Sequence, residues 1–451
     1  MAAAIVEILP GRLWWSPEGH SARTSNTDGA KVIAVEELSD FEYSIPHYTQ
    51  AAAGRAFGPL SLDRILQFCS ELHQGVERFN KLVLTYPPDE IKTHANAAVL
   101  LGAYLVLWLE WSSPNVAQAL GVGHANLMFP CSWLREGPPE PKRVLRVRDC
   151  WEGLEYALSL GWLDPLEFKE PDALADFVFN YRKMAYQFDG CWLVPGFIFV
   201  CSDPVSTVLD PNPVTFTKIF PDDGDEKSSK ASTPRQTPDS VVPIDIGFGD
   251  SDSTPDPSQA GCHSLLQDET DSVDTVCKQY SLATDTKSQF GKAQDFSTML
   301  KGLGVTLLIR TNYTTEPGLS RSYDGEDFKA IGIDHLSMPF PDMRGAVPKA
   351  PEFEILLGRC NDYLDGSKGA IAVHCKGGFG RSICCASKLI SLRYSIPGRA
   401  LLGWLRIVRP GSVNTPNQEQ FISSLRRTAS ATRATHEDRD EVYPKCGCEM
   451  M

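Results

Sequence analysis

The stretch "AIAVHCKGGFGRSICCA", residues 370–386, constrains the fold of this chain more than any other. Its first half is an apolar, β-branched run that predicts a buried strand, and its second half predicts a helix. The three glycines between them permit a tight loop. Strand–loop–helix units build α/β sheets with mostly parallel strands, which carry their sites at the carboxyl ends of the strands. We therefore expect an α/β fold with a functional site around residues 374–382.

The residue types of this loop suit a nucleophile placed beside a bound phosphate. Cys375 precedes the predicted helix, whose N-terminus favours the reactive thiolate. Successive backbone N–H groups can surround a tetrahedral oxyanion, and Arg381 can bind two of its oxygens. The Ser382 hydroxyl can donate to the sulfur and help it leave in a second step. The residues predicted to bind phosphate are Lys376, Gly377, Gly378, Phe379, Gly380 and Arg381.

Composition and charge exclude several other classes of protein. The 451 residues are 42% hydrophobic and 22% charged, as in a globular protein with room for two or three domains. The formal net charge of -14 argues against nucleic-acid binding. The 13 cysteines lack paired metal-site spacing, which predicts reduced thiols in the cytoplasm or nucleus, with no metal or other cofactor. We expect neither a signal peptide nor a transmembrane segment, because the most apolar run, residues 95–109, is too short.

Apolar runs elsewhere predict further strands and helices in alternation. The strands are "KLVLTY" (81–86), "CWLVPGFIFVCSDP" (191–204) and "GVTLLIRTN" (304–312), and the helices include "HANAAVLLGAYLVLWLE" (94–110), "PEFEILLGRCNDYL" (351–364) and "RALLGWLRIV" (399–408). Residues 221–289 are rich in Asp, Ser, Thr and Pro, which predicts a disordered linker. Its three Thr-Pro pairs are either targets of proline-directed kinases or a product of that composition. Residues 428–451 predict a flexible tail.

The chain resembles the Cdc14 dual-specificity phosphatases of the protein tyrosine phosphatase superfamily. The family's loop reads HCKAGLGRTG, against HCKGGFGRSI here. Further matching segments are "FGPLSLDRILQFC" (57–69), "ANAAVLLGAYLVL" (95–107), "WLVPGFIF" (192–199), "LLIRTN" (307–312), "DHLSMPFPD" (334–342) and "WLRIVRPGSVNTPNQEQF" (404–421). The resemblance implies two tandem phosphatase-like domains, each a mostly parallel sheet flanked by helices: a non-catalytic one at 1–220 and a catalytic one at 290–427. Independently, "LVLTYPPDEIKTHANAA" offers the same strand–loop–helix context with neither cysteine nor arginine.

Hydrolysis of a phosphoester by a thiolate also requires an acid for the leaving oxygen. The resemblance assigns this role to Asp342 in "PFPDMRGAVP", with Asp334 as the alternative. It assigns the orientation of the attacking water to Gln418, although an extra residue leaves Gln420 as a second candidate.

Other residues near the loop have supporting or open roles. We expect His374 and Arg409 to support the loop rather than touch substrate. Cys384 and Cys385 either pack in the helix or form a regulatory disulfide with Cys375.

The resemblance implies a cysteine-dependent phosphatase with a phosphocysteine intermediate and a role in cell division. Its substrates would be phosphoproteins, at phosphoserine or phosphothreonine before proline and at phosphotyrosine. Arg182 and Lys183 stand where the family is usually acidic, which predicts that the preference for basic residues in the substrate is either weaker or located elsewhere. The alternatives are a pseudophosphatase that binds phosphoproteins and a phosphoinositide phosphatase; Phe379 disfavours the latter, which tends to carry a second lysine in the loop. The C-terminal "CEMM" fits farnesylation at Cys448, against an unmodified tail.

Overall fold

The computed structural model describes residues 5–18, 29–38, 58–89, 91–129, 145–204, 296–316, 321–342, 345–413 and 415–426. The predicted linker at 221–289, with its Thr-Pro pairs, and the tail at 428–451, with Cys448, lie outside these residues. Among the described helices, none combines the length and apolar character needed to cross a bilayer.

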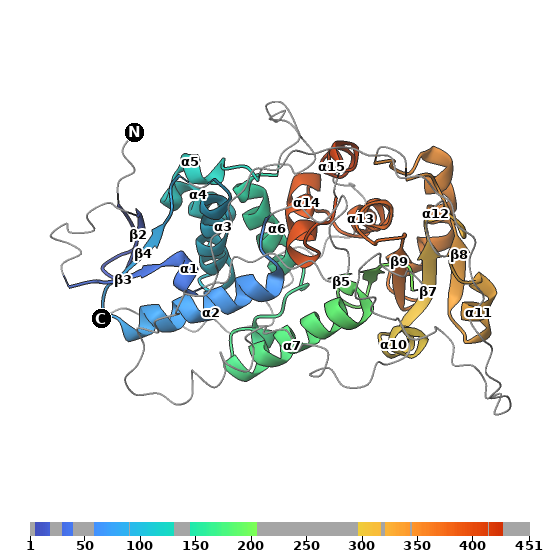
Figure 1. Ribbon diagram of the computed structural model, residues 1–451, viewed down its shortest axis with the longest axis horizontal. Coiled ribbons are helices and arrows are strands. Elements are labelled where there is room, and N and C mark those ends of the chain that lie inside the picture. Colours follow the sequence, from blue (N-terminus) through green and yellow to red (C-terminus); the bar gives the residue numbers. More distant parts are fainter. Residues whose placement is uncertain are drawn as a thin grey trace, which may run out of the picture. The chain divides into compact units, whose positions relative to one another are not determined.

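The first sheet lies in the N-terminal half of the chain (Figure 1). Its strands are β1 (Val6–Leu9), β2 (Leu13–Pro17), β3 (Lys31–Ala34) and β4 (Leu82–Tyr86), in the order β1-β2-β4-β3. The strands β2, β4 and β3 are parallel, and β1 pairs antiparallel with β2. The helices of this half are α1 (Val35–Leu38), α2 (Leu62–Arg78), α3 (Ile91–Leu107), α4 (Ser113–Leu120), α5 (Val122–Ala125) and α6 (Val147–Ser159), followed by a 3₁₀ turn at Pro165–Glu167 and α7 (Pro171–Phe188).

The second sheet has five strands and carries the predicted loop. These are β5 (Gly190–Val194), β6 (Ile198–Cys201), β7 (Val305–Arg310), β8 (Asp334–Ser337) and β9 (Ala370–His374), in the order β5-β6-β9-β7-β8. All are parallel except β5, which forms a hairpin with β6. The remaining helices are α10 (Phe296–Gly302), α11 (Gly325–Ala330), α12 (Ala350–Leu364), α13 (Arg381–Arg393), α14 (Gly398–Val408) and α15 (Pro416–Ser423). The predicted α/β class, with two mostly parallel sheets flanked by helices, is confirmed.

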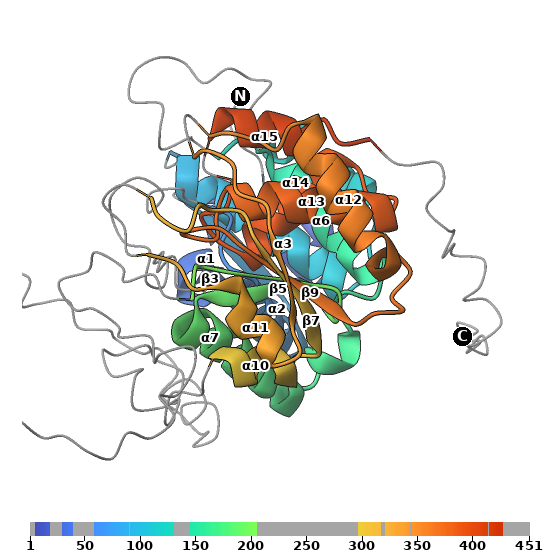
Figure 2. The ribbon, with the colours of Figure 1, turned by 90° about the vertical axis from the view of Figure 1, so that its right-hand side faces the viewer.

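Both faces of the second sheet are buried, as an apolar parallel sheet requires. Along β9, Ile371 and Val373 join the large core that includes α13, whereas Ala370 and Ala372 join a second core with α10 and α11. Figure 2 shows α12 and α13 on one side of the strands and α10 and α11 on the other.

The second sheet does not follow the division expected from the sequence. The hairpin β5–β6 precedes residue 220, the predicted end of the N-terminal domain, yet β6 pairs with β9 in parallel. The two sheets also belong to one compact unit. The strand nearest to the predicted catalytic strand on one side therefore comes from the N-terminal half.

Helices α6 and α14 cross at very close range and join the two halves. A Cβ atom built on Gly403 of α14 would lie 2.1 Å from the carbonyl oxygen of Asp149 in α6. Beside this crossing, Arg399 Nε donates to Asp149 Oδ1 at 2.9 Å, and Trp404 Nε1 donates to the Leu193 carbonyl oxygen at 2.8 Å. Glycine at 403 is thus a requirement of the backbone packing.

We expect Gly403→Ala to lower the free energy of unfolding by about 3 kcal/mol, because the methyl group would have to displace the α6 backbone. Chemical denaturation followed by circular dichroism measures this loss. The matched control is Gly358→Ala in α12, where a Cβ atom meets nothing within 4 Å. That variant should be neutral or stabilised by up to about 1 kcal/mol. Equal stability of the two variants would contradict the close crossing.

Candidate active site

Cys375 directly follows β9 and is joined to the N-terminus of α13 by the glycine-rich loop. Its Sγ accepts a hydrogen bond from the backbone N–H of Gly378 at 3.1 Å and lies 3.4 Å from the Ser382 Oγ donor. Only 4% of the residue is exposed. Gly378 has a φ of +72°, and a Cβ atom there would lie 2.3 Å from the Cys201 carbonyl oxygen. The loop can therefore curl around the sulfur only with glycine at 378.

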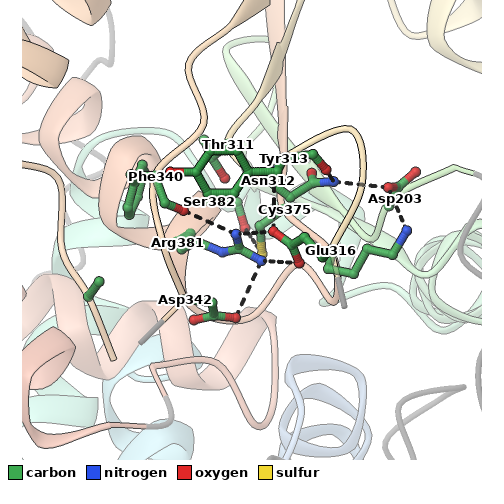
Figure 3. Close-up of polar contacts among 12 residues, drawn as sticks. Asp203, Thr311, Asn312, Tyr313, Glu316, Phe340, Asp342, Cys375, Arg381 and Ser382 are labelled. Carbon is green, nitrogen blue, oxygen red and sulfur yellow. Dashed lines mark hydrogen bonds and ion pairs between the residues drawn. The ribbon is translucent and has the colours of Figure 1, made fainter. Parts of the chain in front are cut away.

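Arg381 begins α13 and is fully buried, with its guanidinium beside the sulfur (Figure 3). Its Nη1 donates to Glu316 Oε1 at 2.6 Å and to the Phe340 carbonyl oxygen at 3.2 Å. Its Nη2 donates to Glu316 Oε2 at 3.2 Å and lies 3.3 Å from Asp342 Oδ2. The Nε atom is buried and has no hydrogen-bond partner among the described residues. The two terminal nitrogens, Nη1 and Nη2, are therefore held by protein acceptors, while Nε remains available for an oxyanion.

The environment of Arg381 keeps it charged. Burial lowers its pKa, but the hydrogen bond to Glu316 and the nearby negative charges outweigh this and raise the pKa above the ordinary value. A permanently charged guanidinium is the donor best suited to phosphate oxygens.

The two candidate acids occupy different places. Asp342 follows β8, is 58% exposed on its side chain and lies against Arg381. Asp334 is the first residue of β8 and forms an ion pair with Arg359 of α12 at 2.9 Å. Since β8 runs parallel to β7 and β9, Asp334 lies a strand length away from the carboxyl edge where the loop begins. The geometry brings Asp342 alone to the site.

The two candidate glutamines are also separated by the structure. Gln418 is 1% exposed at the start of α15, and a Cβ atom on Gly380 would lie 2.7 Å from its Nε2. Its Oε1 is buried without a hydrogen-bond partner in the described part of the chain. Gln420 is exposed. Gln418 is thus the glutamine that borders the loop.

Arg409 stabilises the loop through hydrogen bonds to its backbone. Its Nε donates to the Gly378 carbonyl oxygen at 2.8 Å, and its Nη2 donates to Asp189 Oδ1 at 3.0 Å. Its guanidinium lies 4.3 Å from the centre of the Phe379 ring. Phe379 is only 4% exposed, so its ring packs against Arg409.

His374 is fully buried behind the loop. Its Nε2 lies 2.5 Å from the Tyr323 hydroxyl, and its Nδ1 lies 3.1 Å from the Cys375 carbonyl oxygen. Tyr323 also contacts His335 Nε2 at 3.2 Å. Burial lowers the pKa of His374 to about 4, so the imidazole is uncharged at neutral pH. It can hold the loop through hydrogen bonds without adding charge.

Several residues of the site were missed by reasoning from the sequence. These are Glu316, Asp203, Asn312, Tyr323 and Asp189. Asp203 and Asn312 carried a usable signal, because each lies two residues beyond an apolar strand next to β9. Glu316 lies in an irregular loop without a periodic pattern.

Three other residues singled out from the sequence, Arg182, Cys384 and Cys385, are buried. Arg182 of α7 is 7% exposed and donates from Nε to Asp63 Oδ2 at 2.6 Å. Arg182 is therefore a buried, paired residue, whereas its neighbour Lys183 is partly exposed. Cys384 and Cys385 are fully buried in the large core, where burial raises the pKa of both thiols.

Comparisons with known proteins found similarity to protein phosphatases. A family described as "Dual specificity protein phosphatase, N-terminal half" matches residues 7–157. The Caenorhabditis elegans "Tyrosine-protein phosphatase cdc-14" is 23% identical over 428 residues, covering 93% of this chain and 46% of that protein. The Danio rerio "Dual specificity protein phosphatase CDC14AB" is 23% identical over 367 residues, covering 80% and 44%. The chain thus spans about half the length of these relatives. The crystal structure of Tk-PTP in the G95A mutant form is 20% identical, with a TM-score of 0.24, covering 33% of this chain and 86% of that one.

Proposed function

We propose that this chain, which is similar along most of its length to Cdc14-type phosphatases, is a cysteine-dependent protein phosphatase. The observation that carries the proposal is the loop itself. A backbone N–H and a hydroxyl donate to Cys375 Sγ, and the neighbouring Arg381 keeps a buried, unengaged Nε within the described structure. This arrangement suits a thiolate that faces a phosphate.

In the first step, the Cys375 thiolate attacks the phosphorus of a monoester. The backbone N–H groups of the loop and the Arg381 guanidinium bind the equatorial oxygens as negative charge develops on them. Asp342, whose carboxyl oxygen lies 3.3 Å from Arg381 Nη2, is the group placed to protonate the departing oxygen. The phosphoryl group is then bound to sulfur.

In the second step, water hydrolyses the phosphocysteine. Asp342, now ionised, removes a proton from the water, and Gln418 orients it from its place beside Gly380. Ser382 donates to the sulfur, which makes the thiolate a better leaving group. His374 and Arg409 keep the loop in shape without touching the substrate.

The proposed substrates are phosphoproteins, at phosphoserine or phosphothreonine before proline and at phosphotyrosine, in the cytoplasm or nucleus and in cell division. A pseudophosphatase that only binds phosphoproteins is the second candidate. It is favoured by one observation: Glu316 already engages both terminal nitrogens of Arg381, so phosphate must compete with a carboxylate.

Hydrolysis of a generic aryl phosphate by the full chain, with a chelator present and the Cys375→Ser chain as the blank, separates the two. We expect turnover above the blank and a phosphoenzyme that can be trapped by rapid acid quenching. Activity equal to the blank, together with retained binding of phosphate, would establish the pseudophosphatase instead. Phosphoserine-proline peptides and soluble phosphoinositides, offered at equal concentrations, then define the substrate class.

A further inference from the structure

Three polar side chains continue the carboxyl ends of the adjacent strands β6, β9 and β7. His374, the last residue of β9, is paired with the last residue of each neighbouring strand. Asp203, Lys376 and Asn312 each lie two residues beyond that level. The ladder continues there, since the Asp203 N–H donates to the Lys376 carbonyl oxygen at 3.0 Å. The register therefore places Asp203 directly beside the residue that follows the nucleophile.

The side chains of this row form a buried ion pair. Asp203 is fully buried, and its Oδ2 accepts hydrogen bonds from Lys376 Nζ at 3.0 Å and from Asn312 Nδ2 at 3.1 Å. Lys376 is only 7% exposed. In Figure 3, Asp203 lies on the far side of Cys375 from Arg381. The Lys376 ammonium is thus held and neutralised on the side of the loop away from the guanidinium.

This pairing has a consequence for the charge that a ligand meets. Without its carboxylate partner, the Lys376 ammonium would be a second cation near the loop, in addition to Arg381, whose partner Glu316 a phosphate has to displace. Two cations attract a ligand with two phosphate groups far more than a single phosphate, because the interaction grows with the product of the charges. Joined to Asp203, Lys376 contributes a local dipole with no net charge.

We propose that Asp203 is a positioning residue that sets specificity through Lys376. By holding the ammonium, it leaves Arg381 and the loop amides to bind one phosphate group, and it disfavours ligands with a second phosphate. The inference rests on the proposed function, and it adds a second reason against polyphosphorylated lipid headgroups to the one given by Phe379, which stands in place of a second lysine.

The test compares inorganic phosphate and pyrophosphate as competitive inhibitors of aryl phosphate hydrolysis by the full chain. In Asp203→Asn, the ratio of the pyrophosphate to the phosphate inhibition constant should fall about tenfold, because an ammonium that has lost the Asp203 carboxylate favours the more highly charged ligand. This decrease in the ratio should be smaller at high salt, because salt screens the interaction between charges. Asp203→Asn combined with Lys376→Met should restore the wild-type ratio. A ratio that is unchanged in the single variant, or still low in the double variant, would overturn the proposal.

Controls separate this effect from loss of folding and from failure of the proposed function. Asp63→Asn removes an equally buried partner, that of Arg182, and should leave the ratio unchanged. If Asp203→Asn does not fold, Asp203→Ser provides the same measurement. If neither folds while the double variant is fully active, Asp203 serves only to bury Lys376 and the proposal fails. Direct binding of both ligands to the Cys375→Ser chain, alone and with Asp203→Asn, gives the same ratio even if the wild type shows no turnover.

Discussion

A fragment spanning residues 290–451 is expected to show no phosphatase activity, and addition of residues 1–220 is expected to restore it. Within this fragment, β9 loses β6, the strand that pairs with it along Ile371 to His374. Without β6, β9 would become an edge strand, and its backbone N–H and C=O groups on that side would be unpaired. The loop would lose its support before any substrate arrived.

The energetic reason lies in two buried ion pairs that cross the predicted boundary. Arg409 pairs with Asp189, and Lys376 pairs with Asp203. Removing one partner of a buried pair typically costs about 3–5 kcal/mol. Two such losses consume most of the 5–15 kcal/mol by which a typical domain is stable.

Aryl phosphate hydrolysis and circular dichroism of the fragment, alone and mixed with residues 1–220, measure this dependence. The intact chain is the reference. Activity of the isolated fragment within tenfold of that reference would show that β6 is dispensable for the loop.

The local part of this fold was predictable, whereas the pairing between distant strands was not. The run from Ala370 to Arg381 specifies its own strand, loop and helix through β-branched residues and glycines. The hairpin at 190–201 has an equally clear pattern, but an apolar strand carries no mark of the sheet it will join. Because the hairpin lies close in sequence to the first sheet, it was expected in the N-terminal domain. In the structure it belongs to the second sheet, where β6 pairs with β9.

The same distinction applies to the site. Cys375, Arg381 and Ser382 lie within eight residues of one another, so their spacing alone predicts the chemistry. Asp342 and Gln418 were expected only through resemblance, because their distance from the loop depends on how α12 and α15 pack. Glu316 could not be found at all, since an irregular loop brings it to Arg381.

Replacing Arg381 with lysine is expected to lower kcat/KM for an aryl phosphate by about 10³-fold. The guanidinium serves two partners at once, with Nη1 held by Glu316 and the Phe340 carbonyl oxygen while Nε remains unengaged in the described structure. Lysine offers a single point charge. Glu316, only 13% exposed on its side chain, would capture that charge and leave none for the transition state.

The matched control is Arg359→Lys, which makes the same change in the exposed ion pair with Asp334 and should leave kcat/KM unchanged. Steady-state kinetics of both variants provide the measurement. In Arg381→Lys, kcat is expected to fall by a larger factor than KM rises, because the guanidinium stabilises negative charge that develops during phosphoryl transfer. A loss below tenfold in Arg381→Lys would mean that Glu316 and Arg381 form a purely structural pair. The loop amides alone would then bind phosphate. The Glu316 carboxylate would remain paired with Arg381, as expected for a protein that only binds phosphate, and would not be displaced at each turnover.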